Sequence, residues 1–524
     1  MGYEQLESVI QVRPKSFWAG WHPGKTHNDI PGELENEKAP IGAVDCNSVI
    51  WHRGRLQKMF GYAALTNPTL ESGADITSLH YSPNLLKTLG TVNDALYYGM
   101  ETATPTEITG AATITAAIPV QMVDWEFSTT QYVVGVQSGN TPWKWDGTGT
   151  ATVLGGSPPT GKWSIQWQDA LWIADGSVLH FSGPGDPETW AANDNYKLDA
   201  TITGLASYGE MLVVFMEDHI GILAGTNNQL LTKVSRYIEQ VGCTGGFTIQ
   251  NVKVQGRELI LFHGTNGFYA FDGTRNLVKI SNAISEKYTD GSSVTKWNEG
   301  RYSRAWGKYV PQHGWYMCSL SDGSDTDNGF LLVFDLNKWI ELPNLEGVSI
   351  PIWPCSDQVE ELSCIEVPID SSGDRKLLFG SNDGVVYEYD ASLYSRNGEA
   401  YTCYFQSKIF DLGRNVILLE ANVLGDELGG AGELTTWVNF DMETGSGNQD
   451  TQDMTGGGDQ LEIDWTLGTS ILGGSNQVFK NFAIVHYGRF FQFRWENNEL
   501  DQSMKIHGSE FIFKDIGLMP NAGR

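Results

Sequence analysis

The chain has 524 residues, which is more than one ordinary domain and typical of two or three. It contains 34 Lys and Arg against 63 Asp and Glu, and this net charge of −29 argues against binding nucleic acid through phosphate contacts. The same acidity suits the wall of a conduit that DNA passes without sticking, or it serves solubility alone. The 60 glycines lie between short aromatic and β-branched runs, which indicates an all-β protein with many tight turns.

Residues 1–45 have little hydrophobic periodicity and contain Pro14, Pro23, Pro31 and Pro40. We expect an extended N-terminal arm, which either wraps a neighbouring subunit or packs on its own domain. The first residues carry acidic side chains where a signal peptide needs positive charge. No apolar run reaches the roughly 20 residues of a membrane-spanning helix. We therefore expect a protein made in a cytoplasm, not exported by the standard route, with no membrane segment.

Residues 46–400 contain a loose repeat in which a polar turn leads into a short alternating strand, often with an aromatic–acidic ending. It recurs roughly every 35–65 residues, which suits four-stranded blades with variable loops. The repeat predicts a six- or seven-bladed β-propeller rather than a stack of β-sandwiches. The seven copies are NDALYYG (93–99), NTPWKWDGT (140–148), DGSVLHFSG (175–183), EDHIGILAG (217–225), TNGFYAFDGT (265–274), DNGFLLVFDLNKW (327–339) and NDGVVYEYDAS (382–392).

Residues 401–524 lack the repeat and contain longer alternating strands, for example at 486–497 and 503–517. They predict a separate antiparallel β-sandwich-like domain. No Lys or Arg occurs from Asn415 to Phe479, and basic residues return at Lys480. The acidic and basic regions either pair across a ring of identical subunits or pair within the domain.

Two loops are candidates for chemistry. The stretch FSGPGDPETW (181–190) resembles, at its end, the Asp-box turn of sialidase-like propellers, which is itself a structural turn. The loop SDGSDTDNG (321–329) places Asp322, Asp325 and Asp327 within six residues. Alternating carboxylates followed by Gly can wrap Ca²⁺, whereas Asp- and Gly-rich loops commonly only turn. We name these three carboxylates as the candidate metal ligands.

Catalytic patterns do not occur in the sequence. HExxH, GxSxG and the P-loop pattern are missing, and the ten histidines are isolated. The cysteines form no CxxC pair, and we expect reduced core thiols; they are Cys46, Cys243, Cys318, Cys355, Cys364 and Cys403. Fourteen scattered arginines give no carboxylate-holding cluster of the kind a sialidase needs. We therefore expect no enzyme and no cofactor other than the candidate Ca²⁺.

The segment from Val178 to Gly225 resembles tail proteins of short-tailed bacteriophages, with its Ser-x-Pro-Gly-Asp-Pro-x-x-Trp turn followed by ITGL and a strand ending at DHI. FQSKIFDLG (405–413) resembles the strand that opens the domain after the propeller in such proteins. HYGRFFQFRWEN (486–497) and IHGSEFIFKDIG (506–517) resemble their C-terminal strands. The resemblance covers about two thirds of the chain and is weakest in residues 1–90. Its motifs belong to packing and turns, so no catalytic residue is carried over.

The resemblance implies a structural virion protein, a tail nozzle or hub with a β-propeller, assembled in the host cytoplasm. Such a protein forms a homo-oligomeric ring, expected to be a hexamer, which extends and gates the DNA-ejection channel. Its expected partners are itself, tail adaptor and portal-proximal proteins, and tail fibre or spike proteins, while double-stranded DNA passes without specific binding. The alternatives are a propeller module that binds a receptor or glycan and a propeller glycoside hydrolase.

Overall fold

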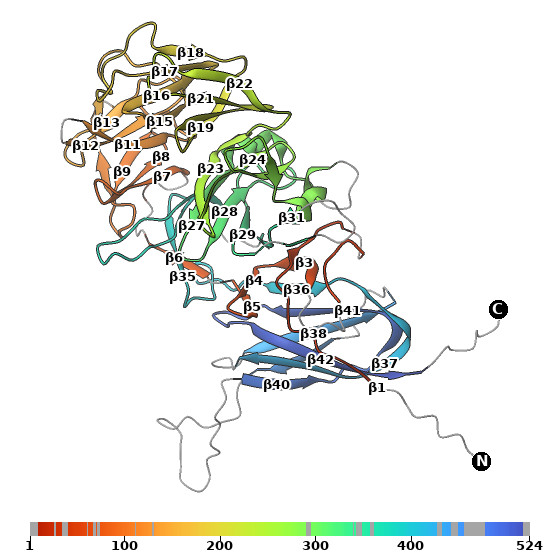
Figure 1. Cartoon of the computed structure of the whole chain (residues 1–524). Helices are drawn as coiled ribbons and strands as arrows, with labels where there is room; N and C mark the ends of the chain where they lie inside the picture. The colour runs from red at the N-terminus through yellow and green to blue at the C-terminus, as the bar shows by residue number, and fades with distance from the viewer. Residues whose placement is uncertain are drawn as a thin grey trace, which may run out of the picture.

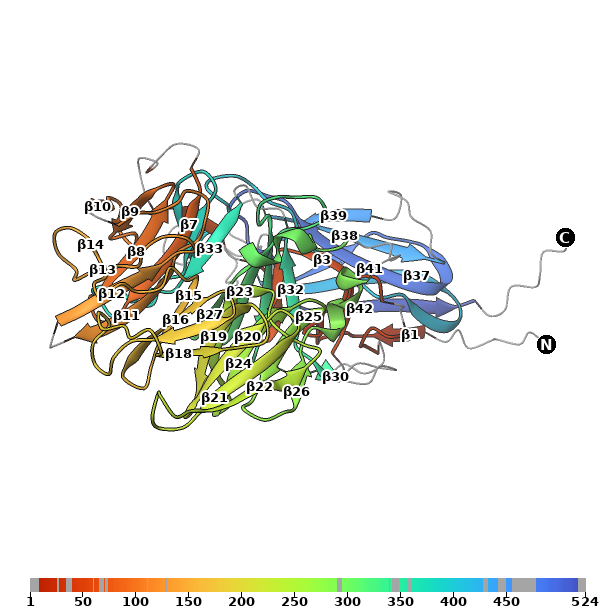
Figure 2. The same cartoon turned by 90° about the horizontal axis from the view of Figure 1, so that it is seen from above.

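A computed structural model of the chain consists of a β-propeller and a second β-domain that lie side by side (Figures 1 and 2). Among the residues it describes, no helix is long and apolar enough to span a bilayer. The described ranges are 9–25, 28–33, 40–59, 61–65, 70, 74–110, 112–127, 130–289, 295–338, 340–341, 348–356, 361–426, 432–441, 449–454 and 477–516.

The propeller consists of seven four-stranded antiparallel sheets within the described ranges. Blade 1 comprises β7 (Ile76–Ser82), β8 (Lys87–Val92), β9 (Ala95–Tyr98) and β10 (Thr106–Ile108). Blade 2 comprises β11 (Gln121–Phe127), β12 (Thr130–Val136), β13 (Trp143–Trp145) and β14 (Thr152–Val153). Blade 3 comprises β15 (Trp163–Trp167), β16 (Ala170–Asp175), β17 (Val178–Phe181) and β18 (Asn195–Lys197). Blade 4 comprises β19 (Ile202–Tyr208), β20 (Met211–Met216), β21 (His219–Ala224) and β22 (Thr232–Glu239).

Blade 5 comprises β23 (Gly245–Val254), β24 (Arg257–Gly264), β25 (Gly267–Phe271) and β26 (Leu277–Lys279). Blade 6 comprises β27 (Trp306–Val310), β28 (Trp315–Leu320), β29 (Phe330–Asp335) and β32 (Ile352–Cys355). Two short 3₁₀ helices, η1 (Asn282–Tyr288) and η2 (Glu299–Arg304), connect blades 5 and 6, and β30 (Ile340–Glu341) pairs with β31 (Val348–Ser349). Blade 7 comprises β33 (Leu362–Glu366), β34 (Leu378–Ser381), β35 (Val386–Asp390) and β6 (Gly61–Ala64).

The ring closes through β6, which comes from the other end of the propeller sequence. It pairs with β35 in the register Tyr62↔Tyr389 and forms the outer strand of blade 7. The innermost strands pack against one another in chain order, and β33 packs against β7 to complete the circle. Because hydrogen bonds join the two ends of the ring, the propeller is closed by pairing rather than by packing alone. The sequence left six or seven blades open, and the structure has seven.

Each of the seven sequence repeats is the third strand of one blade. The aromatic–acidic ending also has a local cause, because the Asp closes a side-chain turn at the end of the third strand. Asp146 Oδ1 accepts hydrogen bonds from the backbone N and Oγ1 of Thr148, and Asp272 does the same for Thr274. Asp390 repeats the arrangement with Ser392. Asp is well suited to such turns because its carboxylate accepts from the backbone two residues further on.

The second domain, called the β-domain below, is built from both ends of the chain. It is a 12-stranded sheet. From the N-terminal part it includes β1 (Val9–Val12), β2 (Gly20–Trp21), β3 (Gly42–Asn47), β4 (Val49–His52) and β5 (Arg55–Lys58). From the C-terminal part it includes β36 (Cys403–Ser407), β37 (Phe410–Asp426), β38 (Glu433–Phe440), β39 (Gln449–Asp453), β40 (Gln477–Phe482), β41 (Tyr487–Asn497) and β42 (Lys505–Asp515).

These pairings correct one sequence prediction and favour one of two alternatives in another. The boundary at residue 46 is wrong, because β3, β4 and β5 belong to the β-domain and the propeller begins at Gly61. For the 1–45 arm, the described part supports the alternative in which it packs on its own domain: β1 pairs with β42 in the register Ile10↔Phe513. Proline spacing identified a segment with little regular structure, but the partner of β1 lies 513 − 10 = 503 residues away and leaves no local signal.

The β-domain folds into two layers with an aromatic core, as expected for a sandwich-like domain. β37 pairs with β41 near Phe410, and further along it pairs with β42 and β40. β41 and β42 face each other without pairing, and the rings of Phe493 and Phe511 lie 5.2 Å apart across the gap. Phe17, from the arm, is fully buried in this core, 4.9 Å from Trp495.

Charges in the β-domain pair within the domain. Arg489 forms two bonds to Asp411, at 2.6 and 2.7 Å, and Arg414 lies 2.9 Å from Asp515. Arg55 of β5 reaches Asp426 of β37. These contacts support the intradomain alternative for the basic residues concerned.

Candidate functional site: the axial channel of the propeller

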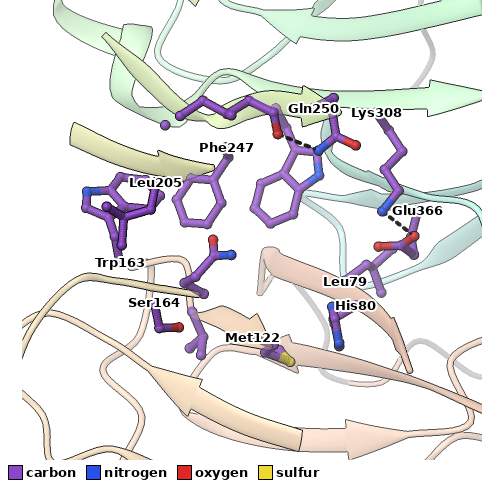
Figure 3. Close-up of a pocket in the computed structure, with 15 residues that line it drawn as sticks. Leu79, His80, Met122, Trp163, Ser164, Leu205, Phe247, Gln250, Lys308 and Glu366 are labelled. Atoms are coloured by element: carbon purple, nitrogen blue, oxygen red, sulfur yellow. Dashed lines mark hydrogen bonds and ion pairs between the residues drawn. The ribbon is translucent and has the colours of Figure 1, made fainter. Parts of the chain in front are cut away.

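The axial channel is the cavity that all seven blades share (Figure 3). Its volume is about 120 Å³, and each innermost strand contributes at least one lining residue. Among them are His80 of β7, Ser164 of β15, Leu205 of β19 and Glu366 of β33. A duplex whose major groove alone is about 12 Å wide cannot enter a cavity of this size. The propeller axis is therefore not a passage for DNA.

One wall of the channel is aromatic. The rings of Phe247 and Trp306 stack with centroids 4.5 Å apart and planes 7° from parallel, and Trp163 lies 4.8 Å from Phe247. Trp306 Nε1 donates to the carbonyl of Ile365 at 3.0 Å, which fixes the indole across a blade boundary. Gly246 makes room for this wall, because a Cβ there would lie 2.3 Å from the Trp163 ring.

Two ion pairs involve side chains that line the channel, and one lining residue has a hydroxyl with no partner among the described residues. Lys308 Nζ lies 2.6 Å from Glu366 Oε1, and His80 Nε2 lies 3.1 Å from Asp124 Oδ2. The Ser164 hydroxyl is buried, its residue being 5% exposed, and it has no hydrogen-bond partner among the described residues. Ser82 also binds Asp124, so the carboxylate lies between Ser and His. A Ser-His-Asp nucleophile needs the imidazole in the middle, and this arrangement is not one.

A second, smaller cavity forms one mouth of the channel and shares Trp306 with the first. Asp75, Asp327 and Glu361 line it together with Arg304. The Arg304 Nη1 atom is 3.9 Å from a carboxylate oxygen of both Asp75 and Asp327, while its Nη2 donates to the Ala117 carbonyl at 2.9 Å. Burial, and then the charge of Asp327, raise the pKa of Asp75 and of Glu361. The mouth thus holds more negative charge than its arginine neutralises.

The candidate metal ligands of the 321–329 loop do not converge. Asp322 binds Lys287 Nζ at 2.8 Å, Asp325 is exposed, and Asp327 turns to the channel mouth. No group of three or more His, Cys, Asp or Glu side chains suited to a metal occurs among the described residues. The predicted Ca²⁺ site is therefore corrected: the loop places one carboxylate at the channel mouth and pairs another with a lysine. Asp75, Arg304 and Glu361 were missed because they come from three separate blade connections.

The 181–190 turn is structural. Asp186 accepts from the Glu188 backbone N at 2.9 Å and from Thr189 Oγ1 at 2.6 Å, and Trp190 Nε1 donates to the Pro187 carbonyl. Glu188 also links blade 3 to blade 2, because its carboxylate binds Lys144 Nζ at 2.7 Å and Gly155 N at 2.7 Å. The Asp-box-like stretch thus joins neighbouring blades.

The six cysteines are all buried, and none of them forms a disulfide. Cys355 lies on β32 of blade 6 and Cys364 on β33 of blade 7, so these two are on different sheets. Burial raises the pKa of Cys243 and of Cys364 to about 12, which keeps both as thiols at neutral pH.

No protein-family model matches the chain, and no curated protein matches it at a significant level. Among solved structures, the computationally designed Ika8 protein is similar at 13% identity, covering 62% of this chain and 99% of that one, with a TM-score of 0.37. The WD40 β-propeller domain of Doa1 is similar at 10% identity over 64% of this chain and 98% of that one, with a TM-score of 0.38. The AfRom2 CNH domain is similar at 9% identity over 63% and 99%, with a TM-score of 0.37. The propeller assignment rests on the strand pairing described above.

Proposed function

We propose that this chain is a structural subunit of a short-tailed bacteriophage tail, a nozzle or hub protein that forms a homo-oligomeric ring around the DNA-ejection channel. The supporting observation is an apolar strip on the β-domain formed by Leu419, Phe479, Val485 and Tyr487, whose exposed fractions are 43, 57, 77 and 58%. Five other large hydrophobics among the described residues are comparably exposed: Leu86, Val153, Leu230 and Val278 are scattered over four blades, and Leu500 lies in the β-domain between β41 and β42. A concentration of this kind is typical of a protein contact.

The rest of the strip's environment also suits subunit contact. β40, which carries Phe479, pairs only with β37 among the described strands, so its other edge offers unpaired backbone groups to a neighbour. The propeller channel is too narrow for DNA, so a conduit would have to lie between subunits. A net charge of −29 would let DNA slide past the wall of such a conduit. The proposal places the protein in the virion, next to adaptor, portal-proximal and fibre or spike proteins.

Negative-stain microscopy and native mass spectrometry of the full chain test the proposal. We expect rings, with a hexamer as the main species, and a Val485→Asp variant that remains monomeric with an unchanged melting temperature. Leu230→Asp is the matched control, because Leu230 is equally exposed at 79% but lies in the propeller. A wild-type chain that stays monomeric at all concentrations, and is missing from purified tails, would contradict it.

A propeller module that binds a receptor or glycan is the second candidate function, and the axial channel with its aromatic wall supports it. Binding of the monomer to a glycan array, with loss on Trp306→Ala, would favour this function over the first.

A further inference from the structure

The proposed ring requires two different contact surfaces on each subunit, because a patch that pairs with its own copy closes a dimer. The apolar strip of the β-domain is one such surface. The other has to complement the strip and its surroundings in shape and charge. The assignment of this second surface rests on the proposed ring function.

Phe479 of the strip also lines a groove of the β-domain, called the β40 groove below, with a volume of about 340 Å³. Leu424 of β37 contributes a second apolar side chain to the lining. Gly508 of β42 lets the arm approach closely, because a Cβ there would lie 3.2 Å from Lys15 Cγ. The β40 groove thus extends the apolar surface of the strip.

The charged side chains that line the β40 groove have a positive sum. Arg13 and Lys15 come from the arm, and Glu510 lies 2.6 Å from Arg13. His507 also lines the groove, and its carboxylate partner at the end of β37 is itself paired with Arg55. With His507 neutral, the lining charges sum to 2 − 1 = +1, whereas the whole chain carries −29. The groove therefore favours an apolar side chain that carries carboxylates beside it.

The turn between β41 and β42 carries such a group of side chains. Leu500 is 48% exposed and stands between Glu499 and Asp501. The Nζ atom of the buried Lys58 donates to the Glu499 carbonyl at 3.0 Å, which holds the turn in place. A turn that is fixed before binding loses little conformational entropy when it docks.

Among the exposed large hydrophobics that the structure describes outside the strip, only Leu500 has a carboxylate on each side. Leu86 and Val278 are each followed by a lysine, and Val153 and Leu230 have no charged neighbour in the sequence. The cations of the β40 groove would repel the first two and gain nothing from the other two. Leu500 is also the one of the five that lies in the β-domain.

We propose that the β41–β42 turn of one subunit docks in the β40 groove of the next. Leu500 packs on Phe479 and Leu424. The carboxylates on either side of it face the cations of the arm, Arg13 and Lys15. Because the turn and the groove are different surfaces of one domain, the contact is head-to-tail and repeats around a ring.

Native mass spectrometry of the full chain over a range of concentrations tests the apolar part of this contact. The Leu500→Asp variant should raise the dissociation constant of the ring contact about tenfold or more, because the leucine loses its burial. Leu230→Asp is the matched control, since Leu230 is exposed at 79% on the propeller, and it should assemble as wild type does. Thermal melting of each variant checks that it is folded.

Exchange of charge between subunits tests the pairing itself. Glu499→Gln with Asp501→Lys changes the charge of the turn from −2 to +1, and Lys15→Glu changes that of the groove from +1 to 1 − 2 = −1. Each of these variants alone brings like charges together and should assemble about fivefold more weakly than wild type. Their 1:1 mixture should recover rings, because every turn then meets a groove of opposite sign. Glu210→Lys, in the exposed turn between β19 and β20, is the control for added positive charge.

The outcomes separate this contact from the ring itself. Rings that form equally well in Leu500→Asp, or in both charge variants alone, would overturn the contact and leave the proposed tail function standing. A mixture of the folded charge variants that fails to recover rings would also overturn the contact alone. A wild-type chain that stays monomeric would overturn the contact and the proposed function together.

Discussion

Arg396 is a buried cation at the junction of the propeller and the β-domain. We expect its Lys and Met variants to differ in free energy of unfolding, with the Met variant the more stable of the two. It is 1% exposed, and its Nη2 donates to Ser48 Oγ at 2.7 Å and to Cys355 Sγ at 2.8 Å. Its guanidinium lies 4.0 Å from the ring centroid of Tyr401. No described carboxylate forms an ion pair with it, and its Nη1 atom has no described partner. The side chain therefore joins Cys355 of blade 6 to Ser48, between β3 and β4, and to Tyr401, just before β36, without a counter-charge among the described residues.

The magnitudes follow from these contacts. The hydrogen bond to Ser48 contributes about 1.5–3 kcal/mol because the donor is charged, and the buried cation–π contact about 2 kcal/mol. Against this stands an effective desolvation penalty of several kcal/mol for the unpaired charge. Arg396→Lys retains the desolvation penalty but loses the planar guanidinium that reaches two acceptors. We therefore expect the free energy of unfolding to fall by about 2–4 kcal/mol. Arg396→Met removes the desolvation penalty and fills most of the volume of the arginine side chain. We therefore expect the free energy of unfolding to fall by less than about 2 kcal/mol.

Urea unfolding followed by tryptophan fluorescence and by far-UV circular dichroism measures this order. Two non-coincident transitions in either variant would mean that the junction has uncoupled the domains, and each transition is then fitted separately. A lysine variant as stable as wild type, or a methionine variant less stable than the lysine variant, would refute the reasoning about the unpaired charge.

Three further predictions concern individual side chains. Burial lowers the pKa of His263 to about 3 and of His22 to about 4, below the ordinary value of 6.5, so the folded protein resists their protonation. The contribution of these histidines to stability is therefore full above pH 6.5 and falls as the pH drops toward 4, by on the order of 3 kcal/mol per histidine. His263→Gln should make the unfolding free energy, measured by urea unfolding at each pH, depend less steeply on pH. Asp186→Ala should lower the unfolding free energy by about 1 kcal/mol through loss of its turn, with no change in oligomeric state by light scattering; a larger effect on assembly than on stability would contradict a purely local role. Gly246→Ala should lower the free energy of unfolding by about 1–3 kcal/mol, because its Cβ would lie 2.2 Å from Thr203 O. An unchanged melting temperature would contradict this, because it would mean that the neighbouring atoms shift to make room at no cost.

The parts of the fold that the sequence predicts are those with a local cause. The third strand of each blade is visible because a turn, an alternating strand and a closing Asp such as Asp146 or Asp272 lie within ten residues. The blade closure by β6 and the β1–β42 pairing are invisible, because each joins segments hundreds of residues apart. The channel mouth could not be predicted from the sequence for the same reason, because Asp75, Arg304 and Glu361 meet only once the ring has closed. Of the acidic loop, only Asp327 reaches that mouth, and no local pattern distinguishes it from Asp322.

The pairing of β6 with β35, and of the first five strands with the last seven, makes the order of synthesis matter. β5 ends at Lys58 and β36 begins at Cys403, so 403 − 58 − 1 = 344 residues are made before the first strands meet their partners. At about 5–20 residues per second this delay is roughly 20–70 s. During that time the N-terminal strands have exposed edges and an aromatic anchor, Phe17, without its core. The propeller can close first, once β35 has left the ribosome, and it then holds the two halves of the β-domain close together for the final step. Because the propeller lies between the two halves of the β-domain in the sequence, closing the propeller first brings those halves together and helps the β-domain to fold.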